Sequence, residues 1–289
     1  MRYYGNIFRP PSERYSLLLQ VTYGCSHNKC TFCGMYADKE FKIRPLEEVL
    51  QDIERFPAFQ KPLVRRVFLI DGNPLCIGTE SLVTILDALR ATFPNLERVG
   101  AYSTSKDIAR MSVEDLKLLK SKQLDIVYIG VESGSDRILR MVKKDSYSKH
   151  MLEAAPKLKE AGIMLSTMIL SGLGGSDNWE EHALESAKLI NQVQPEYLSL
   201  LTLMAREGTE LERDVLSGKF KMVSQVEVMK ETRLFVENLE LENTIFRVSH
   251  PSNLMNLGGV LNKDKQEILD ALYSVSDEEL MQTEFAQIY

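Results

Sequence analysis

Three cysteines near the start of the chain carry the clearest chemical signal. Cys25, Cys30 and Cys33 are spaced Cys-x4-Cys-x2-Cys and follow an apolar run at residues 17–21 that is typical of a buried strand. We therefore expect the thiols in a loop at the carboxyl end of that strand, where so short a segment brings the three sulfurs to one point. Iron–sulfur clusters and structural zinc sites usually take four protein ligands. Three thiolates on a four-iron cluster leave one iron open to a small molecule.

Two other uses of these cysteines fit the sequence less well. A disulfide is disfavoured because three clustered cysteines pair badly and the total of four lacks the framework of a secreted protein. A zinc site of three thiols and His27 is the more serious alternative, although His27 lies only two residues from Cys25, an awkward spacing for a tetrahedral ligand set. Cys76 lies far along the chain in an apolar context and is expected to be a small buried residue rather than a ligand.

The elements that must position these residues alternate between strand and helix. Apolar runs typical of strands occupy residues 17–21, 67–70, 99–102, 126–129, 168–170 and 197–203, with helical periodicity after them. Pro45 can open the helix after the cysteine loop, Ser112 with Asp115 resembles a capping box, and Gly162 is a plausible helix stop. Six strand–helix alternations predict a parallel sheet, and right-handed crossovers curl it toward a barrel.

The predicted fold is therefore α/β, a partial (β/α)6 TIM-like barrel with parallel strands and a short C-terminal α/β extension. One domain suffices for residues 1–289, with its core at about 16–210 and the extension at about 211–289. Each predicted strand runs into a polar or glycine-rich loop, including residues 71–74, 103–105, 130–135, 171–175 and 204–208. Barrels of this kind place their chemistry at that end of the strands.

These features together resemble the radical S-adenosylmethionine (radical SAM) superfamily. The three-cysteine loop after the first strand, with Phe32 just before Cys33, is similar to the cluster loop of that superfamily, whose commonest spacing is Cys-x3-Cys-x2-Cys. The stretch Gly130-Val131-Glu132-Ser133-Gly134-Ser135 resembles the signature after the fourth strand in methylthiotransferase-like and porphyrin-oxidase-like members. The resemblance implies a [4Fe-4S] cluster on Cys25, Cys30 and Cys33, with SAM on its open iron. It also implies an electron donor such as flavodoxin or ferredoxin.

The resemblance further implies where SAM binds. The loop Asp71-Gly72-Asn73 lies where the superfamily binds the amino group of SAM, and Glu132 is placed to bind ribose hydroxyls or that amine. Ile169 lies in a segment like the one that contacts adenine, and Lys143 is the candidate partner of the SAM carboxylate. The remaining candidates for cofactor contact are Phe32, Ser103 and Met204. A plain turn at residues 71–74, a glycine turn after Ile169 and a core position for Met204 stay open.

Composition limits the setting of this chemistry. The chain has 289 residues, 44% of them hydrophobic, and a net charge of −6, so it has no global basic field to attract nucleic acid. No apolar run approaches the ~20 residues that span a bilayer. The amino terminus lacks a signal-peptide pattern, and we expect a protein of the reducing cytoplasm without a membrane partner.

Three functional interpretations follow. The first is a radical SAM enzyme that cleaves SAM to a 5′-deoxyadenosyl radical and abstracts hydrogen from a small substrate. The second is a non-enzymatic iron–sulfur electron carrier or a zinc-stabilised binding protein. The third is radical SAM modification of a macromolecule such as tRNA, which the lack of a basic patch disfavours. The C-terminal part is similar only loosely to oxygen-independent coproporphyrinogen III oxidase, and His250 there is expected to be structural rather than catalytic.

Overall fold

The computed structural model of the chain describes residues 1–281. The chain folds into two compact α/β units. The first comprises Met1–Asn28, Cys33–Ile129 and Glu153–Leu165, and the second comprises Lys29–Phe32, Gly130–Leu152 and the chain from Ser166 onward. In the described part of the chain, the main sheet has eight strands and does not close into a barrel. Within residues 1–281, no helix has both the length and the apolar character needed to cross a membrane.

The first unit contains a run of parallel strands in the order β1-β4-β5-β6. These strands are β1 (Leu17–Gln20), β4 (Arg66–Ile70), β5 (Arg98–Tyr102) and β6 (Leu124–Glu132). The last three residues of β6, from Gly130 on, belong to the second unit. A short antiparallel hairpin, β2 (Thr22–Tyr23) and β3 (Lys42–Ile43), lies on either side of the cysteine loop in the sequence.

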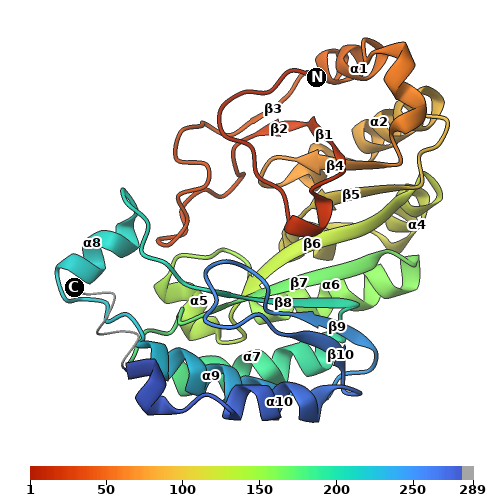
Figure 1. Cartoon of the computed structure of the whole chain (residues 1–289). Helices are drawn as coiled ribbons and strands as arrows, with labels where there is room; N and C mark the ends of the chain where they lie inside the picture. The colour runs from red at the N-terminus through yellow and green to blue at the C-terminus, as the bar shows by residue number, and fades with distance from the viewer. Residues whose placement is uncertain (282–289) are drawn as a thin grey trace. The chain divides into compact units, whose positions relative to one another are not determined.

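The helices of the first unit follow its strands in sequence. They are α1 (Leu46–Glu54), α2 (Thr79–Thr92), α3 (Ser105–Arg110) and α4 (Val113–Ser121), with 3-10 turns η1 (Pro11–Glu13), η2 (Ala58–Leu63) and η3 (Pro74–Ile77). Helices α1 and α2 lie side by side (Figure 1), and α2 also contacts α4. The buried residues of α2 recur at helical spacing, which gives this helix one apolar face.

One face of the first unit's sheet carries an aromatic cluster. Leu18, Phe68 and Ile70 pack there with Tyr102 and Tyr128. The Phe68 ring meets the Tyr102 ring edge-on, with centroids 5.0 Å apart. Because residues two apart on a strand point to the same face, the alternation along β4 places Phe68 and Ile70 together on it.

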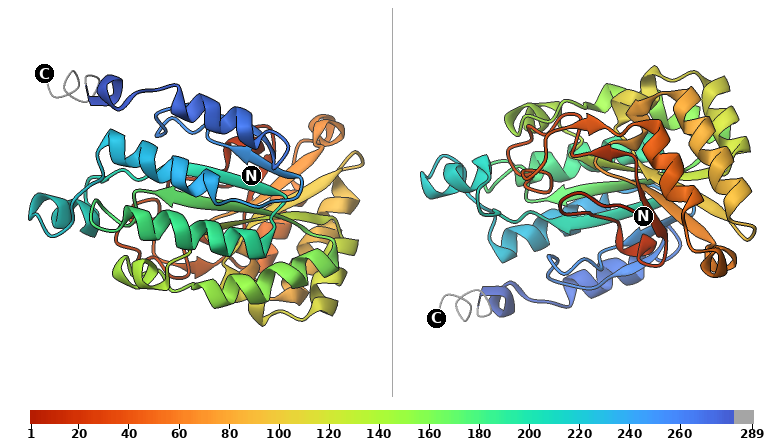
Figure 2. Two further views of the ribbon diagram at one scale, coloured as in Figure 1. Left: turned by 90° about the horizontal axis from the view of Figure 1, so that it is seen from below. Right: turned by 90° about the horizontal axis from the view of Figure 1, so that it is seen from above.

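The second unit continues the α/β pattern beyond the sixth predicted strand. Strand β7 (Met164–Ser171) is parallel to β8 (Tyr197–Thr202), β8 is parallel to β9 (Thr244–Arg247), and β10 (Gly258–Leu261) is antiparallel to β9. Helices α7 (Trp179–Val193), α9 (Gln225–Glu237) and α10 (Lys265–Tyr273) lie side by side along these strands (Figure 2). The remaining helices are α5 (Asp136–Met141), α8 (Glu210–Leu216) and α6 (Ser148–Ala161), which passes from the second unit to the first.

The structure confirms the predicted α/β fold with mostly parallel strands. All six predicted strands form, Ser112 caps α4 by accepting from the Asp115 amide, and Gly162, with φ of +72°, follows α6. The predicted extension adds two strands to the sheet and places α9 beside α7 and α10 beside α9. We predicted a single domain over residues 1–289. Its last residues, 282–289, lie outside the described part of the chain.

Candidate active site

The loop after β4 buries a charged pair directly beside the cysteine loop. Asp71 and Lys39 form an ion pair with 2.8 Å between Nζ and Oδ2, and neither side chain has exposed surface. The same oxygen accepts from Gln20 Nε2 at 2.9 Å and from the Gly24 amide at 3.1 Å. The other oxygen, Asp71 Oδ1, has no hydrogen-bond partner among the described residues, although it is buried. The carboxylate is thus anchored through one oxygen and has an unused acceptor in the other.

Asn73, two residues on, has the same kind of arrangement. It is fully buried, and its Nδ2 donates to Ser26 Oγ at 3.0 Å and to Asp107 Oδ2 at 2.6 Å. These two bonds fix which end of the amide is nitrogen. The amide oxygen, Asn73 Oδ1, lacks a partner within residues 1–281. The loop therefore holds two buried acceptor oxygens that receive no hydrogen bond from the described residues.

Gly72 allows this loop to lie against Cys25. A Cβ at position 72 would lie 2.7 Å from Cys25 Cβ and 2.9 Å from a Tyr36 ring carbon, distances that real Cβ atoms do not show. The Gly72 amide also donates to the Gly24 carbonyl at 3.0 Å. Glycine is thus required here by close approach, and the two predicted loops are packed together within the first unit.

The middle of the cysteine loop is fixed within the second unit. The Thr31 amide donates to the Val142 carbonyl at 3.0 Å, and the Thr31 carbonyl accepts from the Leu211 amide at 2.9 Å. Phe32 packs on a buried cluster that includes Ile138 and Leu173. The aromatic residue before Cys33 is therefore a packing anchor of its loop in this structure.

The donor set of the loop fits an iron–sulfur cluster. Cys25, Cys30 and Cys33 are all partly exposed, and no disulfide occurs among the four cysteines, all of which the structure describes. Across residues 1–281, no three His, Cys, Asp or Glu side chains come together as the ligands of a single metal ion do. The predicted meeting of the three sulfurs at one point is thus not found among these residues. In a four-iron cluster each thiolate binds a separate iron, so the ligand role does not require it.

Cys76 is partly exposed, like these three cysteines, and is not the buried residue that the sequence predicted, but it lies outside their loop. It lies in η3, and its amide donates to the Asn73 carbonyl at 3.3 Å. Burial raises the pKa of the Cys76 thiol to about 11, with further contributions from Asp107 and Cys25. A thiol that stays protonated at neutral pH is a poor metal ligand and a poor nucleophile.

Glu132, at the end of β6, is buried, and only one of its two carboxylate oxygens has a hydrogen-bond partner in the described chain. Its Oε1 lies 3.1 Å from Lys144 Nζ, whereas Oε2 has no partner in the described chain. Its backbone φ of +67° is in the left-handed region, which is uncommon for a residue other than glycine. Ser135, three residues on, caps α5 by accepting from the Ile138 amide.

The basic residues in and just after α5 have different partners. Lys143, the candidate for the SAM carboxylate, lies 2.7 Å from Glu210 and is half-exposed. Lys144 contacts Glu132 instead. Arg137 pairs with Glu181 of α7. Of these three cations, Lys144 is therefore the one in contact with Glu132.

The other candidates lie at or near strand ends. Ile169 is buried on β7, and Ser103 is buried after β5, with its amide donating to the Tyr128 carbonyl. Met204 follows β8 with 54% of its surface exposed, so it is not the core residue considered as an alternative. His250 is part of a local turn in which its Nδ1 accepts from the Ser252 amide at 3.1 Å.

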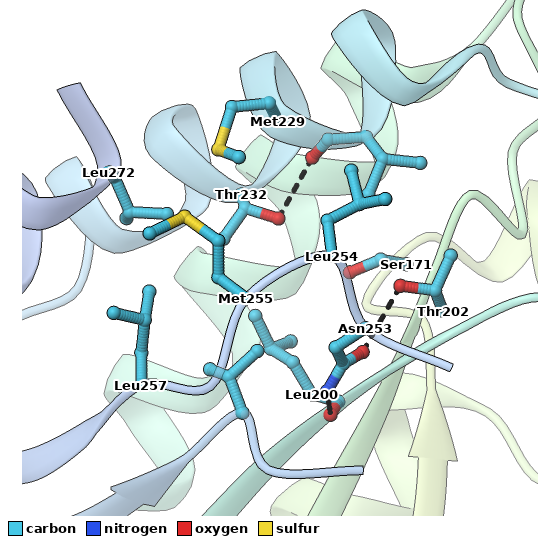
Figure 3. A pocket seen from close by; sticks show the side chains of 12 residues that line it. Ser171, Leu200, Thr202, Met229, Thr232, Asn253, Leu254, Met255, Leu257 and Leu272 are labelled. Atoms are coloured by element: carbon cyan, nitrogen blue, oxygen red, sulfur yellow. Dashed lines mark hydrogen bonds between the residues drawn. The ribbon is translucent and has the colours of Figure 1, made fainter. Parts of the chain in front are cut away.

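A small cavity in the second unit adds no substrate site. It has a volume of about 20 Å³ and is lined by residues that include Ser171, Thr232, Leu254 and Met255 (Figure 3). Asn253 crosses one side of it, donating to the Leu200 carbonyl at 2.8 Å. A cavity needs roughly 10–15 Å³ to hold a water molecule. This space therefore suits a single water rather than a substrate.

Sequence reasoning did not identify the partners of these side chains. No sequence motif marked Lys39, Asp107 or Lys144. The same holds for a buried pair, His182 and Glu231, in which Nδ1 of the histidine lies 3.1 Å from Oε1 of the glutamate. The position of Glu231 in the helical pattern could have indicated that it has a buried partner. Glu231 lies on the same helical face as the buried Val228 and Phe235, where an ionisable residue requires a partner.

Comparison with known proteins identifies the family of this chain. Residues 19–187, more than half of the chain, match the radical SAM superfamily. The chain belongs to this superfamily and is an enzyme whose cofactors are a [4Fe-4S] cluster and SAM. The alternative of a non-enzymatic carrier or zinc protein is thereby overturned.

Two relatives show how much of the chain is shared. The chain is 26% identical over 219 residues to a tRNA-2-methylthio-N(6)-dimethylallyladenosine synthase of Thermosipho africanus, covering 71% of this chain and 48% of that protein. It is 24% identical over 202 residues to a threonylcarbamoyladenosine tRNA methylthiotransferase of Rickettsia prowazekii, covering 68% and 47%. The chain therefore spans about half the length of these relatives.

Solved structures show the same fold. Coproporphyrinogen III oxidase of Escherichia coli matches with a TM-score of 0.55 at 15% identity, covering 77% of this chain and 52% of that one. Methylornithine synthase matches with a TM-score of 0.53 at 15% identity, covering 90% and 81%. At these identities the likeness concerns the fold alone.

Proposed function

We propose that this enzyme reductively cleaves SAM at a cluster held by Cys25, Cys30 and Cys33, and that it abstracts a hydrogen atom from a bound substrate. The observation that carries the proposal is the pair of buried, unpartnered acceptors on the loop after β4, Asp71 Oδ1 and Asn73 Oδ1. The amino group of SAM brings N–H donors, which need acceptor oxygens when the cofactor is bound. Its chemistry complements these two oxygens.

The neighbouring residues hold both acceptors in place. Lys39 neutralises Asp71 through the other carboxylate oxygen, so the free oxygen belongs to a fixed group. Asp107 fixes the Asn73 amide in the same way. Glu132 Oε2 is a third acceptor, in the second unit, and is assigned to ribose hydroxyls or the amine. Preorganised polar groups bind a charged ligand without a reorganisation cost at the moment of reaction.

The cofactors supply the bond cleavage itself. When bound, the reduced cluster supplies the electron that splits SAM into methionine and a 5′-deoxyadenosyl radical. The residues of this chain bind and orient SAM and limit access of water. A one-electron donor of the flavodoxin or ferredoxin kind is proposed as the partner that reduces the enzyme.

The test is SAM cleavage by anaerobically reconstituted enzyme. With dithionite, chromatography should detect 5′-deoxyadenosine even without substrate, and a Cys33→Ala variant should form none. An Asn73→Leu variant should keep its iron but bind SAM about tenfold more weakly, because one charge-assisted hydrogen bond is lost. If iron-replete enzyme binds SAM yet forms no deoxyadenosine with any strong reductant, the proposal is wrong.

The substrate proposed first is a small molecule, because the chain has a net charge of −6 and so lacks a global attraction for nucleic acid. A second candidate is tRNA, which is favoured by the names of the two relatives above. The two are separated by adding unmodified tRNA to the reconstituted enzyme. Faster deoxyadenosine formation, together with a mass change in a nucleoside of the digested tRNA, would select tRNA.

A further inference from the structure

A buried histidine contacts the loop that carries Glu132. His182 on α7 is almost without exposed surface, and its Nε2 lies 3.1 Å from the main-chain carbonyl oxygen of Glu132. Its other ring nitrogen, Nδ1, lies 3.1 Å from Glu231 Oε1 on α9. Both neighbours of the ring are hydrogen-bond acceptors. A neutral imidazole has only one N–H, so both contacts are made only by the imidazolium form.

Glu231 extends this contact to a second loop. Its two carboxylate oxygens accept from the Gly172 amide, at 2.9 and 3.1 Å, just after β7. The Glu231 side chain is only 2% exposed, so its charge is compensated by His182 and by this amide rather than by solvent. One buried pair thus connects the carboxyl ends of β6 and β7, the two strands that carry the proposed SAM contacts Glu132 and Ile169.

Helix α7 also holds the residues that follow Glu132. Ser186, one helical turn after His182, accepts from the Gly134 amide at 2.9 Å through Oγ. Glu181 accepts from Ser135 Oγ at 2.6 Å. Glu132 has a φ of +67°, a conformation that is unfavourable for a residue with a side chain and persists only where its surroundings impose it. The contacts from α7 are those surroundings.

We infer that His182 and Glu231 are positioning residues that hold Glu132 for SAM, and that deprotonation of His182 weakens SAM binding. The inference rests on the proposed role of Glu132. Neither residue is proposed to touch SAM. Their effect passes through the backbone of Glu132 and of Gly172.

The direction of the pH effect follows from the charges around the ring. Burial lowers the pKa of His182, but the charge and hydrogen bond of Glu231 and the contact with Glu132 outweigh it, so the pKa is raised. Glu231, Glu132 and Glu181 are the charged groups that interact with the ring. Below the raised pKa both contacts form. Above it, the remaining proton stays toward the carboxylate, and Nε2 no longer donates to Glu132.

The experiment compares wild type with Glu231→Gln, which keeps the shape of the side chain and removes its charge. SAM affinity of the reconstituted holoenzyme is measured by calorimetry from about pH 6 to about pH 9. Wild type should lose about tenfold in affinity as pH rises through the His182 pKa, the effect of one charge-assisted hydrogen bond. In Glu231→Gln the same loss should occur at lower pH. Lys188→Gln, an exposed change on the same helix, should give the wild-type profile.

A second measurement does not depend on SAM. Nitrogen NMR of the histidine rings should show both nitrogens of His182 protonated at neutral pH in wild type, and one in Glu231→Gln. A neutral His182 in wild type would overturn the inference, as would coincident pH profiles of wild type and Glu231→Gln. If Glu132→Gln leaves SAM affinity unchanged while the ring is doubly protonated, the role of Glu132 fails, and with it the link to SAM.

Discussion

Lys39 Nζ lies 2.8 Å from Asp71 Oδ2, and both side chains are completely buried. Lys39 follows the third cysteine in the sequence, and Asp71 directly follows β4. The ion pair therefore connects the cysteine loop to the loop that carries the proposed acceptors for the SAM amino group. The pair uses only one oxygen of Asp71. Lys39 thus sets both the charge balance and the orientation of the carboxylate.

Removing Lys39 should therefore destabilise the first unit. Lys39→Met leaves Asp71 as a buried uncompensated charge and should lower the free energy of unfolding by about 3–5 kcal/mol, measured by denaturant titration. Lys42→Met is the matched control, because Lys42 pairs with Glu40 on the surface, where solvent screens the pair and its loss should leave stability almost unchanged. Similar losses in the two variants would contradict a special role for the buried pair.

The three cysteines of the loop should bind the cluster, and Cys76 should not. Reconstituted Cys76→Ala should keep the full iron content, because the thiol at position 76 has a pKa of about 11 and does not ionise near neutral pH. Cys25→Ala, Cys30→Ala and Cys33→Ala should each lose most of their iron, measured by iron analysis and absorption spectra. Full iron in the Cys30→Ala variant would refute the ligand assignment.

The fold was largely predictable because its signals are local. Apolar runs such as residues 67–70 and caps such as Ser112 depend on neighbours in the sequence, and both formed as predicted. The sequence also placed Asp71, Asn73 and Glu132 at strand ends. Local patterns therefore predicted the strands and the position of the proposed site on them.

The partners of these residues were not predictable, since they come from distant positions. Asn73 meets Asp107 of α3, and Glu231 of α9 meets His182 of α7. Nothing in either segment specifies a contact across 34 or 49 residues. The sequence likewise did not specify that Lys143 pairs with Glu210 while Lys144 contacts Glu132.

Glu132 should support SAM binding rather than stability. Glu132→Gln should keep the fold and the iron content but weaken SAM binding about tenfold, since an amide is a poorer acceptor than a carboxylate. Calorimetry with SAM measures the effect. Glu160→Gln, which removes a surface carboxylate paired with Lys117, should leave SAM affinity unchanged and serves as control. Equal affinity of Glu132→Gln and wild type would count against this role.

Asp52 should stabilise the fold in a pH-dependent way. Burial raises the pKa of Asp52, but hydrogen bonds from Arg2 and Arg44 outweigh it and lower the pKa below its ordinary value. The stabilisation is therefore present above the unfolded-state pKa and disappears as pH falls through the folded-state pKa. Asp52→Asn should cost about 2 kcal/mol at neutral pH, and the difference from wild type should shrink below about pH 4. A pH-independent difference would show that the charge of Asp52 contributes nothing.

Gly134 should tolerate no side chain, because α7 packs directly on it. A Cβ at this position would lie 2.0 Å from the Glu185 carbonyl oxygen and 2.6 Å from Ser186 Cα, both backbone atoms of a helix that cannot give way cheaply. The φ of Gly134 is outside the left-handed region, so the requirement for glycine is one of space alone.

Gly134→Ala should therefore displace the loop from α7, destabilise the second unit by about 3 kcal/mol and weaken SAM binding together with it. Gly162→Ala separates the two possible reasons for a glycine. Gly162 has a φ of +72°, but a Cβ there would meet only a flexible lysine carbon at 3.8 Å, so the change should cost about 1–2 kcal/mol without any effect on SAM. Thermal unfolding and calorimetry on both variants give the comparison. If Gly134→Ala is as stable as wild type and binds SAM equally well, α7 does not hold this loop as closely as the structure indicates.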